Sequence, residues 1–251
     1  MFCTKDLVGG IMKRINRAAE LLWVFGIVFV ALGVSICSKA DLGVSMIAAP
    51  AFIIQEAIAP LWSGFSVGVV EYLVQGVLLI IMCLVVREFD VRYLLGFGVA
   101  VLYGYALNFF LWVLSGVQVA SVAGRWVLLL VGDCCTAFGV ACFFHTYMPL
   151  QVFELFVTEL TNRYNLHIHK VKWAYDMSLL AVSIILAFTL FGDVKTFDWS
   201  TIGYSSFHSI GLGTLVTTII NSPIISRMDK LICRIFGDEA RFPKLEEKLK
   251  L

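Results

Sequence analysis

Residues 19–37 read AELLWVFGIVFVALGVSIC and contain a single charged side chain, Glu20. An α-helix needs about 20 predominantly apolar residues to cross the hydrocarbon core of a bilayer, where it satisfies all of its own backbone groups. This stretch therefore predicts a membrane-spanning helix. Because the charged Lys39 and Asp41 follow it instead of a small-residue cleavage site, we do not expect a cleaved signal peptide.

Five further apolar runs have a similar length. They cover residues 65–86, 94–114, 126–144, 173–191 and 202–220. The composition agrees, since 60% of the residues are hydrophobic and only 15% are charged, whereas a soluble domain has about a quarter charged residues. One soluble core could not bury so much apolar surface. We therefore predict an all-α membrane protein with six transmembrane helices and the lipid bilayer as its main partner.

Two shorter apolar segments lie between these runs. Residues 43–59 contain Pro50, and residues 149–160 carry Glu154 and Glu159. Each segment is short and partly polar, which favours a re-entrant or interfacial helix over a complete span. The alternative of two further tilted spans stays open from the sequence.

The positions of the basic residues predict the orientation. With the N-terminus in the cytoplasm and six spans, all but three of the 19 Lys and Arg residues fall on the cytoplasmic side. The three exceptions are Lys39, Arg125 and Lys195. Cytoplasmic loops are enriched in Lys and Arg, so we predict that both termini are cytoplasmic.

The second half of the chain resembles the first. Residues 31–34 (ALGV) match residues 137–140 (AFGV), and Glu71 matches Asp176 at nearly the same offset. Gly96 and Gly104 match Gly203 and Gly211 in the same order. The repeating unit is span, short helix, span, span. Because it has an odd number of spans, the second copy enters the membrane from the opposite side, as in the inverted repeats of many secondary transporters.

This repeat divides the chain into four parts. A cytoplasmic segment of residues 1–18 precedes the first repeat, residues 19–116, and the second repeat covers residues 125–223. Residues 224–251 form a charged tail in which apolar residues recur at helical spacing, so we expect a short amphipathic helix there.

Charged side chains at membrane depth are costly and mark candidate binding sites. Lys39 and Asp41 follow the first span, where they would either form a charged rim for a polar substrate, or serve structure, with Asp41 capping the next helix. Glu71 and Asp176, at matching repeat positions, would either take up and release protons or bond to neighbouring helices. The further candidates for substrate binding are Asp133, His208 and Asn108.

The run LGVSICSKADLGVS, residues 32–45, resembles the signature that follows the first helix of the YczE-like proteins in the YitT/YczE group. The resemblance extends more weakly to about Pro223, and it implies a bacterial inner-membrane protein with a duplicated helical fold. Met46 stands where that group has a proline, and Asn108 where an acidic residue is expected. The resemblance implies no particular activity.

Small-molecule transport is the function that this pattern favours, with an unknown polar substrate. The alternative is a membrane sensor or an assembly partner in which the duplication serves only packing. The sequence contains no nucleophile–base, metal-binding or nucleotide-binding motif. We therefore expect no enzyme activity, no cofactor, no metal and no nucleic-acid partner. The sequence leaves open whether the chain assembles with copies of itself or with another chain.

The topology can be tested with reporter fusions. A reporter placed after Leu251 and one inserted near Ser121 should give signals from opposite sides of the membrane, because an odd number of spans separates them. Enzymatic reporters that are active on only one side measure this directly. Signals from the same side would contradict both the six spans and the inverted repeat.

Overall fold

The structure is a computed structural model, and it describes residues 19–62, 64–146, 148–191 and 208–236. These residues form eight helices and no strand. The helices are α1 (Ala19–Lys39), α2 (Ala49–Ile58), α3 (Val67–Val86), α4 (Tyr93–Val113), α5 (Val122–Phe144), α6 (Val152–Tyr164), α7 (Ile168–Phe191) and α8 (Leu212–Phe236).

Five of these helices, α1, α3, α4, α5 and α7, are long and apolar enough to cross a membrane. They coincide with five of the six predicted runs, so the prediction of a multi-pass helical membrane protein is confirmed. The helices α2 and α6 have 10 and 13 residues, which is too short to cross a bilayer. Each follows the first long helix of its half, where the sequence predicted a short helix.

The last helix differs from its prediction. The expected sixth run, residues 202–220, begins among residues that the structure does not describe. The helix α8 starts at Leu212 and continues through Pro223 to Phe236, into the predicted tail. Four residues of its first turns, Thr214, Thr217, Thr218 and Asn221, are buried. These polar residues, together with charged ones in its second half such as Arg227, Asp229 and Lys230, give α8 a lower mean hydropathy than the other long helices. A total of six spans therefore stays a prediction.

The most extensive contact between two helices in the described structure is the crossing of α1 and α5, where glycines bring the two backbones together. A Cβ atom on Gly33 would lie 2.6 Å from the carbonyl oxygen of Gly132, and one on Gly139 would lie 2.9 Å from that of Gly26. No side chain fits at such distances. Small residues at these positions allow two membrane helices to approach through their backbones, as helix packing in lipid requires.

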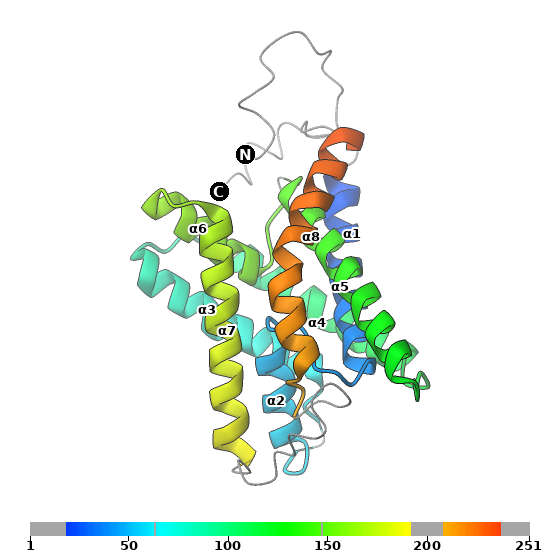
Figure 1. The fold of residues 1–251 in the computed structure, drawn as a ribbon. Helices are drawn as coiled ribbons and strands as arrows, with labels where there is room; N and C mark the ends of the chain where they lie inside the picture. The colour runs from blue at the N-terminus through cyan, green and yellow to red at the C-terminus, as the bar shows by residue number, and fades with distance from the viewer. Residues whose placement is uncertain (1–18, 63, 147, 192–207, 237–251) are drawn as a thin grey trace.

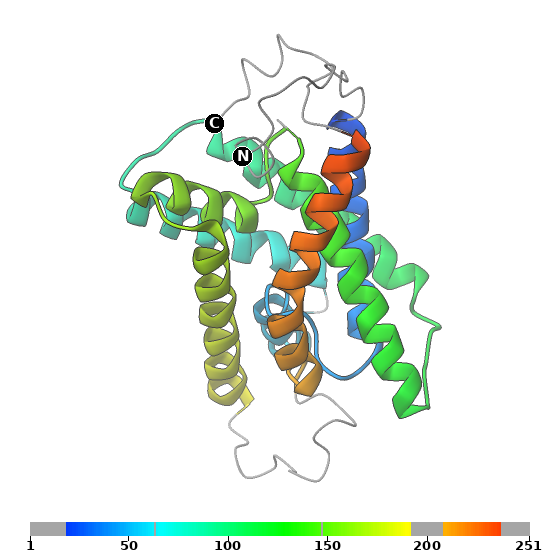
Figure 2. The same cartoon turned by 45° about the horizontal axis from the view of Figure 1, so that its top comes forward.

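The short helices pack against the opposite half of the chain. The helix α2 contacts α7, and α6 contacts α3. In Figures 1 and 2, α1, α5 and α8 lie together on one side of the molecule, and α7 stands on the other side. The helices α3 and α6 run beside each other at a steep angle to α7. Contacts between the two halves therefore occur both at the glycine crossing and around the short helices.

We expect the substitution Gly33→Ala to destabilise the fold, because the added methyl group would collide with the backbone of α5. Overpacking of this kind costs about 1–3 kcal/mol. Thermal unfolding in detergent measures the effect. The control is Gly98→Ala in α4, whose new methyl group would meet no atom within 4 Å. Equal unfolding temperatures for the two variants would contradict the close crossing.

Candidate functional site

A group of polar side chains is buried where α3, α4, α6 and α7 meet. We call it the buried polar cluster. It consists of Glu71, Gln75, Tyr103, Glu154, Lys172, Tyr175 and Asp176, each at most 7% exposed. Glu71 and Asp176, which the sequence placed at matching repeat positions, are both buried, and the structure places them in the same region.

The contribution of α3 is a carboxyl and an amide on one helix face. Glu71, Gln75 and Leu78 follow one another at spacings of four and three residues, which places them on one face of the helix. Leu78 packs against the apolar residues around Phe153 and Tyr175, so this face points toward α6 and α7. Neither carboxylate oxygen of Glu71 and neither polar atom of Gln75 has a hydrogen-bond partner in the described structure.

Glu154 is the contribution of α6. It lies in the first turn of this helix and is 3% exposed, and its Oε2 atom has no hydrogen-bond partner among the described residues. It interacts electrostatically with Lys172 and Asp176 of α7. The short helix α6 thus directs a carboxyl group into the protein.

The helix α7 supplies the remaining charges. Lys172 Nζ donates a hydrogen bond of 2.8 Å to Asp176 Oδ1, and the same nitrogen lies 6.0 Å from the ring centroid of Tyr175. The Tyr175 ring stacks on Phe156 at 5.1 Å. The Tyr175 hydroxyl has no hydrogen-bond partner in the described part, and it lies in the neighbourhood of Glu154, Asp176 and Glu71. Tyr103 of α4 is likewise near Glu71 and Glu154.

The cluster contains three carboxyl groups and one ammonium group among its described residues. Only Asp176 is directly paired with Lys172. A buried charge without a partner is strongly unfavourable, so the two remaining carboxyl groups are stable only when they hold protons or a cation. The arrangement can therefore bind positive charge, and most of its unpartnered polar atoms are oxygen acceptors.

Lys39 and Asp41 lie together in a second place, a polar pocket of about 260 Å³ at the end of α1. Ser38, Gln55 and Ser209 also line this pocket. Asp41 pairs with Arg125 at 3.0 Å. The alternative prediction that Asp41 caps the next helix was wrong, because α2 begins after Ala48 and no side chain caps its N-terminus. Asp41 instead adopts a left-handed conformation with φ of 54° in the turn that ends α1.

Two other candidates lie near this pocket and have defined partners. His208 Nδ1 is 2.9 Å from Glu56 Oε1, and the His208 ring stacks on Phe191. Asn108 Oδ1 accepts a hydrogen bond of 2.9 Å from the backbone N–H of Gly68, in the first turn of α3. Its Nδ2 donates to Ser66 Oγ at 2.8 Å. Asn108 thus caps α3 from a neighbouring helix, a structural task that occupies both ends of its amide.

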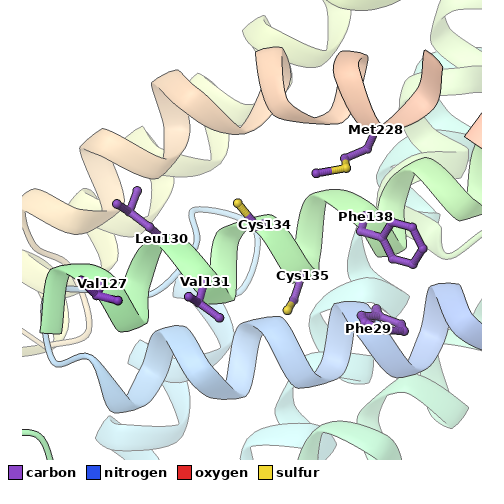
Figure 3. A pocket seen from close by; sticks show the side chains of 8 residues that line it. All are labelled: Phe29, Val127, Leu130, Val131, Cys134, Cys135, Phe138 and Met228. Carbon is purple, nitrogen blue, oxygen red and sulfur yellow. The ribbon is translucent and has the colours of Figure 1, made fainter. Parts of the chain in front are cut away.

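Asp133 is separate from both sites. It is buried in α5, and its Oδ2 atom has no hydrogen-bond partner in the part of the chain described. Beside it on the same helix, Cys134 and Cys135 line an open groove of about 430 Å³ (Figure 3). Its other lining residues are Phe29, Val127, Leu130, Val131, Phe138 and Met228. Apart from the two thiols, these side chains are apolar or a thioether, so the groove offers no recognition of a polar substrate.

Five members of the cluster were missed by the sequence analysis: Gln75, Tyr103, Glu154, Lys172 and Tyr175. Lys172 was expected in the cytoplasm, but α7 begins at Ile168, so that Lys172 is inside the helix. The signal was present in the spacing. Lys172 precedes Asp176 by one helical turn, and Glu71 precedes Gln75 in the same way. No group of three or more His, Cys, Asp or Glu residues in the described ranges is arranged to hold a metal ion.

Comparison with known proteins identifies a family but no activity. The model of DUF6198, a family of unknown function, matches residues 17–230, which include all the spans that the structure describes. That family description carries no YczE or YitT name, so the resemblance to that group stays a prediction. No curated protein and no solved structure matches the chain.

The buried ion pair of α7 gives a test of the site's electrostatics. We expect Lys172→Met to destabilise the protein by about 3–5 kcal/mol, because it leaves Asp176 buried without its cation. The double variant Lys172→Met/Asp176→Leu should recover most of this loss, since it removes both charges. Unfolding in detergent measures each variant. A double variant as unstable as the single one would show that the pair is not the source of the effect.

Proposed function

The chain belongs to DUF6198, and because the function of that family is unknown, we propose one from the residues themselves: small-molecule membrane transport. In this proposal the buried polar cluster binds the substrate or a coupled proton. The whole chain has six spans in two inverted repeats that move relative to each other. The resemblance to the YczE-like proteins adds the expectation of a bacterial inner membrane with both termini in the cytoplasm.

The observation that carries the proposal is Glu71. Its side chain is fully buried, and both of its carboxylate oxygens lack a hydrogen-bond partner in the described structure. A stable membrane protein gains nothing from an unsatisfied buried carboxyl group, since such groups are expensive and mark ion and substrate pathways. Glu71 belongs to the first half of the chain, whereas Glu154 and Asp176 belong to the second. The cluster therefore lies between the two halves of the chain, where the proposed transport requires relative movement.

The packing supports two repeats related by a pseudo-two-fold axis. If α1 to α4 correspond in order to α5 to α8, the contact of α2 with α7 is the counterpart of the contact of α6 with α3. The glycine crossing has the same reciprocity. Gly33 corresponds to Gly139 and Gly26 to Gly132, so the contact of Gly33 with Gly132 is the counterpart of the contact of Gly139 with Gly26. Substrate sites of inverted-repeat transporters lie at such interfaces.

The polar pocket at the end of α1 fits this scheme as an entrance. It is lined by Lys39 and Asp41, and it lies on the side of the membrane that the basic residues predict to be external. Polar substrates would meet this pocket before they reach the buried polar cluster.

One observation favours a second candidate function, a sensor or assembly partner that transports nothing. The crossing of α1 and α5 is packed through backbone contacts, which excludes a polar passage along that part of the interface. Under this candidate the duplication serves packing, and the buried polar cluster responds to protonation without moving a substrate. The two candidates differ in one measurable property, the accumulation or loss of a compound across the membrane.

The first experiment compares the metabolites of cells that express the natural chain with those of cells that express Glu71→Gln at equal membrane abundance. We expect a small set of compounds to differ in concentration between the two, because the substitution removes the carboxyl group that holds protons or substrate. Uptake of each compound into proteoliposomes then identifies the substrate. Identical metabolite profiles would favour the sensor.

The second experiment measures pH dependence. Transport of the compound so identified should respond to pH, and Glu71→Gln and Asp176→Asn should each flatten that response, because both substitutions keep the side-chain size but forbid titration. The control is Glu88→Gln, which changes an exposed carboxyl group in the loop between α3 and α4. A pH profile that is the same in all four proteins would contradict proton coupling through the cluster.

A further inference from the structure

The chemistry of the buried polar cluster indicates which ligand it accepts. The described structure presents six polar atoms of four side chains in this region without a hydrogen-bond partner, from Glu71, Gln75, Glu154 and Tyr175. Five of these atoms are oxygens, and the sixth is the amide nitrogen of Gln75. A ligand that satisfies them needs several hydrogen-bond donors.

The charge of the cluster points in the same direction. The side chains of Glu71 and Glu154 are fully buried or nearly so, and the nearest described cation, Lys172 Nζ, is bonded to Asp176 instead. An anion would meet two carboxyl groups at this place, and a neutral ligand would leave them uncompensated. A cation removes the electrostatic cost of burying both.

The resident Lys172 shows how such a cation is held. Its ammonium group donates to a carboxylate at 2.8 Å and lies 6.0 Å from the centroid of the Tyr175 ring. A carboxylate together with an aromatic face is a favourable environment for an ammonium or guanidinium group. The hydroxyl end of Tyr175 lies near Glu71 and Glu154 as well. A second cation beside these carboxyl groups would therefore also meet carboxylates and an aromatic side chain.

We propose that the buried polar cluster binds a small organic cation with N–H donors, a primary ammonium or guanidinium compound, through Glu71, Gln75, Glu154 and Tyr175. This inference rests on the proposed function and names the substrate class of its site. A divalent metal ion is the weaker fit, since the described residues offer no group of three ligands arranged for one. An ammonium group has three donors and a guanidinium group five, which matches the surplus of oxygen acceptors.

The test measures binding to the purified full-length protein in detergent, with no transport required. Methylammonium chloride at about 10 mM should raise the unfolding temperature by about 2–4 °C. Tetramethylammonium chloride carries the same charge without N–H donors, and sodium chloride controls for ionic strength, so neither should match this rise. Sodium acetate tests an anion. No stabilisation by methylammonium, or equal stabilisation by tetramethylammonium or acetate, would overturn the proposal.

Variants locate the site. Glu71→Gln should weaken the apparent affinity for methylammonium about tenfold or more, whereas the exposed control Glu88→Gln should leave it unchanged. If Glu71→Gln does not fold, Glu154→Gln provides the same test from α6. Unchanged affinity in the folded variant would overturn the assignment of the site.

The outcome also separates this inference from the proposed function. Methylammonium binding that depends on Glu71, without accumulation of any compound in proteoliposomes, would keep the cation site and reject transport. Accumulation of a neutral or anionic compound, without methylammonium binding, would keep transport and reject the cation site.

Discussion

The close approach of the α1 and α5 backbones is the contact on which the arrangement of the other helices depends. In a bilayer, two apolar helices gain nothing from hiding their side chains from lipid, so association relies on fit and on backbone proximity. Gly26 and Gly33 of α1 meet Gly139 and Gly132 of α5 without intervening side chains. Because this crossing joins the first helix of each half, it determines where the following short helices lie. Each of them then reaches across to the opposite half, α2 to α7 and α6 to α3.

The buried polar cluster lies where those exchanged contacts occur. Packing alone would place apolar residues there, as it does in the neighbouring group around Leu79, Met82 and Leu155. The carboxyl groups of Glu71 and Glu154 lower stability in the absence of protons or a cation. A residue pair that costs stability and is brought together by distant segments is better explained by a function than by the fold.

The membrane class and most helix positions could be predicted from the sequence, because long apolar runs bounded by charges leave few alternatives. The length of α8 was not predicted, since Pro223 and the charged Arg227 and Asp229 beyond it look like the end of a span. The site was predicted only in part. Glu71 and Asp176 stood out as isolated charges in apolar runs, whereas Glu154 lay in a segment that already looked polar.

The remaining members could not be found from local patterns. Lys172 was interpreted as part of the cytoplasmic loop before the fifth span, because the apolar run begins after it. The helix α7 begins earlier, at Ile168. That Glu154 of α6 approaches Lys172 and Asp176 of α7 depends on the tertiary arrangement of these helices. A single sequence without the fold contains no signal for such a convergence.

The glycine crossing also limits how the molecule can rearrange. Gly26 and Gly33 lie on either side of the middle of α1, and contacts with α5 continue toward both ends, where Leu22 packs with Cys142 and Asp41 pairs with Arg125. The two helices therefore touch along most of their length. Tilting one against the other would break these contacts, and pulling them apart would open a gap that lipid chains cannot fill. If the protein transports a substrate as proposed, the moving parts would then have to be the other helices, which shift around this pair where α2 meets α7 and α6 meets α3.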